Sequence, residues 1–275
     1  MRHAAFLSCL ILSLLGVPGL RGQDRQPHLI LSLFTGVRAG HRIWTLRDQP
    51  LVAYTPGLVP SGQFDTLNLE RRIASGFVAG ASGVYFPGPH LGFEGEIAFL
   101  GMTVESSCSI RQSQPLVTGD IGPELCSSLQ GQAMAMSAVS FGIGVVGRLA
   151  PASKVYPYVR ANAGLIARTR STIEMNGSYT DASGEISPIT LLADSSPTNV
   201  GLHGTLAAGL VFTMGTGYQV RLEGRDVMAV LDQVTGRADP SSGTLVPPRS
   251  GRLVHNFALI VALDVILEHS RRRRY

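Results

Sequence analysis

The sequence predicts an all-β protein, an eight-stranded antiparallel up-and-down transmembrane β-barrel with short periplasmic turns and long extracellular loops. Eight segments alternate apolar and polar residues with the period of two that marks a strand. Most of them exceed the roughly 5–6 residues of a typical soluble strand. The connections alternate between long and short, and one face of most strands is apolar while the other carries small residues and isolated charges.

The connections between the strand segments give the topology. Three are short, "PGP", "APASK" and "GTG", and four are long and polar, at about 45–66, 106–129, 173–197 and 232–251. An up-and-down meander places all short turns at one end and all long loops at the other, as in bacterial outer-membrane barrels. The predicted strands are approximately 29–44, 67–86, 90–105, 130–149, 155–172, 198–214, 217–231 and 252–269.

The composition narrows the function classes. The 275 residues are 44% apolar, which argues against a disordered chain. The net charge is only +4, and no basic stripe with interleaved aromatic residues occurs, so we do not expect a nucleic-acid partner. No zinc-ligand spacing and no phosphate-binding glycine loop is present, so we expect neither a metal nor a cofactor.

The N-terminus has the features of a secretory signal. Arg2 and His3 precede the apolar run 4–17, which Pro18 and Gly19 end. We expect residues 1–22 to be a signal peptide and residues 23–275 to form one barrel domain in the cell outer membrane.

The charged strand residues lie on the face opposite the apolar one. In "GYQVRLEGRDV" (217–227), Gln219, Arg221, Glu223 and Arg225 occupy every second position. The interior of an eight-stranded barrel is only wide enough to be filled by side chains, so bulky apolar residues at every inward site would overfill it. We therefore expect the apolar faces to contact lipid and the charges to form arginine–carboxylate pairs that plug the lumen. The predicted network comprises Glu94, Glu96, Arg160, Arg168, Arg221, Glu223 and Arg225.

Asp226 does not fit this alternation, because it falls on the outward face. Either the strand bulges there or the bilayer ends below it.

Aromatic residues gather beside the short turns. We interpret them as a periplasmic girdle at the membrane interface, although aromatic residues also favour strand ends in any β protein. The predicted girdle comprises Tyr85, Phe93, Tyr156, Phe212 and Tyr218.

Two cysteines, Cys108 and Cys126, remain after removal of the signal, and an exported chain favours a disulfide between them over two free thiols. Both fall in one segment between two strand patterns, so the bridge would staple a single long loop.

The architecture, with stretches such as "VYPYVRANAGL" (155–165) and "YQVRLEGRDV" (218–227), resembles the OmpA/OmpX-type small outer-membrane barrels. The resemblance implies recognition of a C-terminal aromatic by the barrel assembly machinery. Tyr275 ends the chain, but four arginines separate it from the last strand. We interpret these arginines as a solvated periplasmic tail, with a specific partner site as the alternative.

We expect a non-enzymatic barrel with a structural role or with ligand binding through its long loops. The alternatives are a narrow channel, a lipid-modifying enzyme, and a soluble lipocalin-like barrel with inverted faces. A lipid A deacylase would need a His-x-Ser pair, and neither His203 nor His255 provides one. The remaining partners we expect are outer-membrane lipid and lipopolysaccharide. The candidates for pairing with lipopolysaccharide phosphates, or for plain solvation at the rim, are Arg42, Arg47, Arg71 and Arg72.

Overall fold

The structure is a computed structural model. It describes residues 28–51, 66–111, 121–130, 133–169, 171–180, 183–195, 200–214, 217–238 and 245–267. The predicted signal peptide and the arginine-rich tail with Tyr275 lie outside these residues.

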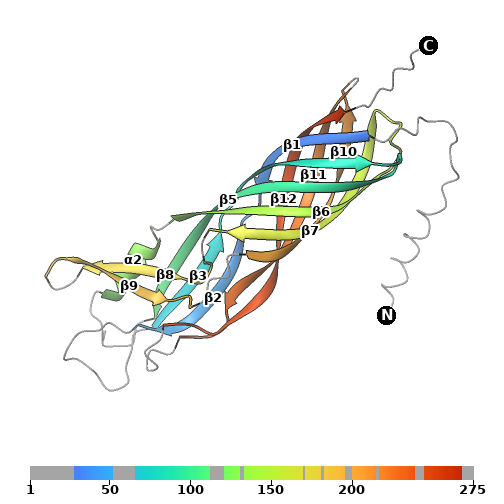
Figure 1. The fold of residues 1–275 in the computed structure, drawn as a ribbon. Coiled ribbons are helices and arrows are strands. Elements are labelled where there is room, and N and C mark those ends of the chain that lie inside the picture. The colour runs from blue at the N-terminus through green and yellow to red at the C-terminus, as the bar shows by residue number, and fades with distance from the viewer. Residues whose placement is uncertain are drawn as a thin grey trace, which may run out of the picture.

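Eight strands form a closed ring in which every neighbouring pair is antiparallel (Figure 1). The N-terminal strand pairs with the C-terminal one, and β5 pairs with β6, so the ring has no free edge. In ring order the strands are β1 (His28–Arg38), β4 (Gly76–Phe86), β5 (Leu91–Arg111), β6 (Ala133–Arg148), β7 (Val155–Arg168), β10 (Val200–Thr213), β11 (Tyr218–Val234) and β12 (Arg249–Leu267). The predicted eight-stranded meander is confirmed.

The first two predicted strands are each divided in two. β2 (His41–Pro50) continues β1 after a break at 39–40, and β3 (Thr66–Ile73) precedes β4 across a break at 74–75. A Cβ on Gly40 would lie 2.6 Å from the carbonyl oxygen of Ile73. The close approach of these two backbone segments at the break therefore requires glycine. β2 pairs with β3, and β3 pairs with the outer part of β5, so this group of strands extends beyond the ring.

The long-loop end contains regular structure that the sequence did not predict. α2 (Ile121–Gln130) lies in the cysteine loop, and β8 (Met175–Thr180) with β9 (Ile186–Leu192) forms a hairpin. Figure 1 shows these elements beyond the barrel, at the end opposite the short turns. We call β2, β3, residues 104–111 of β5, α2, β8 and β9 the cap.

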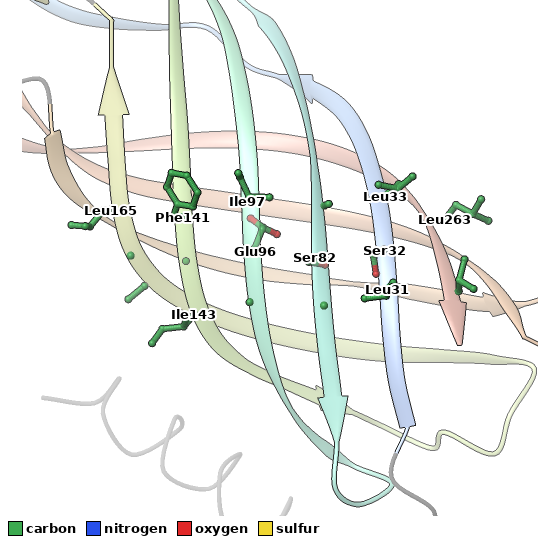
Figure 2. Close-up of a pocket in the computed structure, with 17 residues that line it drawn as sticks. Leu31, Ser32, Leu33, Ser82, Glu96, Ile97, Phe141, Ile143, Leu165 and Leu263 are labelled. Carbon is green, nitrogen blue, oxygen red and sulfur yellow. The ribbon is translucent and has the colours of Figure 1, made fainter. Parts of the chain in front are cut away.

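The outer wall of the ring is apolar. Leu33 is 69% exposed, Ile143 is 77% exposed and Leu259 is 68% exposed, although all three lie within strands. Figure 2 shows apolar side chains on the outer surface of several adjacent strands. The side chains of Glu96 and Ser82 lie on the opposite face of the same wall. Such a belt is lipid-facing, so the soluble alternative with inverted faces is wrong. Among the described residues, no helix is long and apolar enough to cross a membrane.

Candidate functional site: the lumen and its cap

A cluster of charged side chains fills the lumen in the half nearer the short turns, and Arg160 of β7 lies at its centre. Its Nη1 is 2.5 Å from Glu94 Oε1 and 2.7 Å from Glu96 Oε2, and its Nη2 is 2.9 Å from Glu223 Oε1. The Arg160 side chain has 0% exposure. One guanidinium thus joins carboxylates from β5 and β11 across the barrel.

Two further arginines complete this ion cluster. Arg225 donates two hydrogen bonds to Glu96, of 2.9 and 3.1 Å, and a third from Nε to Glu223 at 2.8 Å. Arg221 lies 3.1 Å from Glu223 and 3.3 Å from Asp264 of β12. All of these side chains point into the lumen because each occupies an inward position of the period-two alternation. Arg221 and Asp264 come close because β11 and β12 are paired.

Six of the seven predicted network residues therefore lie in one cluster, but Arg168 does not. It is eight residues further along β7 than Arg160, which corresponds to about 26 Å at the rise of a strand. Arg168 instead lines a cavity nearer the cap, close enough to Asp232 for an electrostatic interaction.

The sequence reasoning also missed two members. Asp264 is buried beside Arg221, and the Tyr158 hydroxyl donates a hydrogen bond to Glu223. Both positions have the inward parity of their strands, so parity alone could have identified them.

The energetics explain why the charges of the ion cluster are paired. A charge buried without a partner is strongly destabilising, and removing one partner of a buried pair costs about 3–5 kcal/mol. Because each carboxylate in the ion cluster faces at least one guanidinium, the groups hold one another in place across the barrel. The cavities that adjoin the cluster measure only about 20 and 10 Å³.

A second layer seals the lumen at the short-turn end. Arg148 stacks over the Phe86 ring at 3.4 Å, and the Tyr156 hydroxyl donates to Gln219 at 3.0 Å. Tyr156 is only 2% exposed, so its assignment to the aromatic girdle is wrong. It shares a strand face with Arg160, and that face points inward.

The other girdle candidates lie differently. Tyr85, Phe93 and Tyr218 are exposed on the outer wall beside the short turns, and Phe212 is half-buried.

The lumen on the cap side of the ion cluster is apolar, which the sequence analysis did not anticipate. Leu100, Met102, Met136, Ile166 and Leu231 line a cavity of about 40 Å³ there. The alternation in the sequence predicts mainly small residues and charges at inward sites. The reason for the difference is that this end has become the hydrophobic core beneath the cap.

A disulfide fastens the cap. Cys108 and Cys126 are bonded, with their Cα atoms 5.0 Å apart, so the predicted bridge is confirmed. It does not staple a loop onto itself, because Cys108 lies in β5 and Cys126 in α2. Leu125 and Leu129 of the helix are fully buried against the core.

Two side chains of β2 tie the cap across the barrel mouth. Trp44 Nε1 donates to the Thr172 carbonyl oxygen at 2.9 Å, and Gln49 Oε1 accepts from the Ala238 backbone N–H at 2.9 Å. These contacts link the first hairpin to segments that follow β7 and β11.

The four rim arginines have separate environments. Arg42 pairs with Glu70 at 3.0 Å and Arg72 pairs with Glu105 at 3.1 Å, both in exposed positions. Arg71 is buried and donates to the Ser106 hydroxyl at 2.9 Å, whereas Arg47 is exposed. Burial lowers the pKa of Arg71 to about 10.

The two candidate histidines lie on opposite faces of the wall. His203 is buried toward the lumen. His255 is exposed on the outer wall, with Nδ1 2.7 Å from Asp226 Oδ2. This pair accounts for the outward acid that interrupts the apolar face of β11. Within the described part of the chain, no group of three or more His, Cys, Asp or Glu side chains could hold a metal ion.

No family model and no curated protein matches the chain. Among solved structures it is similar to OprG from Pseudomonas aeruginosa, with 10% identity, a TM-score of 0.43, and coverage of 91% of this chain and 100% of that chain. It is similar to Neisserial surface protein A, with 10% identity, a TM-score of 0.40, and coverage of 86% and 96%. It is also similar to Ail of Yersinia pestis in complex with a heparin analogue, with 11% identity, a TM-score of 0.35, and coverage of 89% and 100%. The closed ring of strands and the apolar belt of this chain make it a small outer-membrane β-barrel, the class that the OmpA/OmpX resemblance implied.

Proposed function

We propose that this protein is a non-enzymatic, non-conducting outer-membrane barrel that holds a rigid cap at the cell surface for binding to an extracellular partner. The observation that carries this proposal is the combination of a filled lumen with a cap that is itself a packed unit. The lumen is filled by the ion cluster and by the Arg148–Phe86 stack. The cap has its own buried leucines and a disulfide.

The β8–β9 hairpin is the part of the cap best suited to contact a partner. It forms a two-stranded sheet of its own, outside the ten-stranded sheet that contains the ring. Ile186 at its tip is 72% exposed, while Met175 and Leu192 at its base are buried. The hairpin is thus anchored at one end and open to solvent at the other.

Binding can be tested with purified protein in detergent against immobilised surface polysaccharides and host matrix proteins. The matched variant replaces residues 178–187 with a Gly-Ser linker of equal length and keeps the buried base. We expect at least tenfold weaker binding by this variant, with unchanged heat-modifiable gel migration. Equal binding by both chains would contradict a role for the hairpin.

The closed lumen is tested separately in planar bilayers. We expect no single-channel steps from the intact chain. Steady conductance that disappears in a mutant lacking the lumen charges would instead support the channel alternative.

Membrane partners are part of the proposal. The apolar belt contacts outer-membrane lipid, and the exposure of Arg47 supports a contact with lipopolysaccharide phosphates at the rim. Recognition by the barrel assembly machinery stays a prediction from the resemblance and the C-terminal aromatic Tyr275, which lies outside the described residues. Weaker binding of purified lipid A by Arg47→Ala, with equal folding, would support the phosphate contact.

One observation favours a second candidate, a lipid-modifying enzyme. The His255–Asp226 pair faces lipid and has the geometry of a base oriented by a carboxylate. The residues opposite the pair in the strand ladders are Leu206, Phe257 and Met228, none of which has a hydroxyl nucleophile. Mass spectrometry of lipid A from cells expressing the chain tests this candidate, and a mass change abolished by His255→Ala would favour it over the binding role.

A further inference from the structure

Arg38 is a buried cation at the inner wall of the barrel. It is the last residue of β1, it is only 3% exposed, and it has the inward parity of Ile30 and Phe34. Its Nε and Nη2 are buried and have no hydrogen-bond partner in the part of the chain that the structure describes. Its ladder partners are Ala258 and Gly76, whose small size leaves room for the guanidinium.

The acids of the described lumen are already engaged. Glu96 shares a cavity of about 10 Å³ with Arg38, but both of its carboxylate oxygens accept from Arg225 and one also contacts Arg160. Glu94, Glu223 and Asp264 face other arginines in the ion cluster.

The acids nearer the cap are also committed elsewhere. Asp232 interacts with Arg168, and Asp226 points outward to His255. A buried cation in this position therefore calls for a counter-ion that none of the described carboxylates supplies.

The space beside Arg38 has a definite size and chemistry. Arg38, His41 and Arg168 contribute its basic groups, and apolar side chains such as Met102 and Leu231 form most of the remainder. Both ring nitrogens of His41 are buried without a hydrogen-bond partner in the described structure. The volume of about 40 Å³ corresponds to roughly three water-sized sites, since one such site needs about 10–15 Å³.

Of the three basic groups beside this space, Arg168 interacts with Asp232, and the other two, Arg38 and His41, differ in charge. Burial and the charge of Arg38 both lower the pKa of His41 from its usual value, so at neutral pH the ring is uncharged and offers one N–H donor. Arg38 then contributes a single positive charge with free donors, and His41 contributes a neutral donor.

We propose that the cavity between Arg38 and His41 binds one compact monovalent anion, of which chloride is the physiological representative. One negative charge neutralises Arg38 without leaving an excess, and the small volume favours a compact ion. The wall is mostly apolar and offers few hydrogen-bond donors, which favours an ion that does not need donors on every side. This inference is independent of the proposed binding role of the cap.

The location gives the ion a structural consequence. The β1–β12 ladder ends at Arg38–Ala258, and beyond it β2 pairs with β3. An anion held by Arg38 at the end of β1 and His41 at the start of β2 would fasten the junction from which the cap extends.

The test compares sodium chloride with sodium gluconate at equal ionic strength, using the full folded chain in detergent. Unfolding is followed by the heat-modifiable gel shift. We expect chloride to raise the unfolding midpoint by several degrees, with a saturable dependence on concentration. Arg38→Met should abolish this chloride-specific difference, whereas Arg42→Gln, an exposed arginine of the same hairpin, should retain it.

The Arg38→Met chain also separates a bound ion from general salt effects. Any difference between the two salts that persists in this variant is nonspecific and is subtracted. If the wild-type chain shows only that nonspecific difference, the proposal is overturned.

A second measurement does not depend on a variant that folds. Crystals of the wild-type protein grown in sodium bromide should give an anomalous peak within hydrogen-bond reach of Arg38 Nη2 and the His41 ring. Bromide peaks only on the protein surface, with water alone in the cavity, would overturn the proposal.

Discussion

In the half of the lumen nearer the short turns, the carboxylates of the ion cluster face arginines, whereas in the half nearer the cap Nε and Nη2 of Arg38 have no hydrogen-bond partner among the described residues. The first half is also crossed by hydrogen bonds between strands, while the second is lined mainly by apolar side chains. The barrel therefore combines two different interiors. One is the ion cluster, a plug in which the buried charges are paired with one another. The other is the apolar cavity near the cap, where a buried cation lacks a counter-ion among the described residues. The ion cluster supports the closed lumen that we propose, and the apolar cavity and the cap are the sites at which we propose that ligands bind.

The largest expected effect comes from removing Arg160, the central cation of the ion cluster. Arg160→Met leaves Glu94, Glu96 and Glu223 with fewer cations, and we expect it to lower the free energy of unfolding by about 3–5 kcal/mol. Urea unfolding in detergent, followed by gel shift, measures the change. The control is Arg42→Met, whose exposed pair should contribute less than about 1 kcal/mol. Equal losses in the two variants would contradict the plug.

The cap side is tested by removing its covalent tie. The Cys108→Ser/Cys126→Ser double variant should lose about 2–4 kcal/mol of stability in the cap, because the bridge closes a segment with a sequence separation of 18. We expect faster proteolysis within the cap, while the ring keeps its heat-modifiable migration. Loss of the folded ring together with the cap would show that the two are a single cooperative unit.

A smaller loss of stability is expected from removing the hydrogen bond between Tyr156 and Gln219 at the short-turn end of the lumen. Tyr156→Phe removes the hydroxyl that bonds Gln219 in the lumen, and we expect a loss of about 1 kcal/mol. Tyr85→Phe is the matched control, because Tyr85 is exposed on the outer wall and should change little. A larger loss for Tyr85→Phe would mean that the two faces have been assigned in the wrong sense.

The smallest effect concerns pH at the surface of the cap. Hydrogen bonds from Thr180, one of them 2.5 Å long from its hydroxyl, lower the pKa of Glu124 below its ordinary value of 4.5. A lowered pKa means that the contact is fully present above about pH 4.5 and is lost as the pH falls through the folded-state value. We expect protease sensitivity between α2 and β8 to rise below pH 4.5, and Thr180→Val to show that sensitivity already at neutral pH. A profile that is the same in both chains would exclude this contact as the cause.

Period-two alternation was enough to predict the strands and to place Glu94, Glu96, Arg160, Arg221, Glu223 and Arg225 inside. It succeeds because inward and outward positions differ in chemistry along every strand of a barrel. The same parity places Tyr156 inside, and its position beside a short turn, which is typical of an interfacial girdle, is misleading.

Other features follow from contacts between segments far apart in the sequence. Arg168 has the inward parity, yet its distance along the strand puts it in another layer. α2 and the β8–β9 hairpin are short elements whose buried residues, such as Leu125 and Met175, pack into the same hydrophobic cluster as residues of distant barrel strands. Local periodicity over so few residues does not reveal such packing.

The pairing of β1 with β12 has a consequence for the time course of folding. Leu29 lies opposite Leu267, so residues near the two ends of the described chain must meet before the ring is closed. Contacts of such long sequence separation form slowly, because the entropy of the intervening chain must be lost first. Until β12 is available for pairing, the backbone N–H and C=O groups along one edge of β1 have no strand partner. A nascent chain of this protein therefore needs protection from edge-to-edge association for the whole of its passage to the membrane.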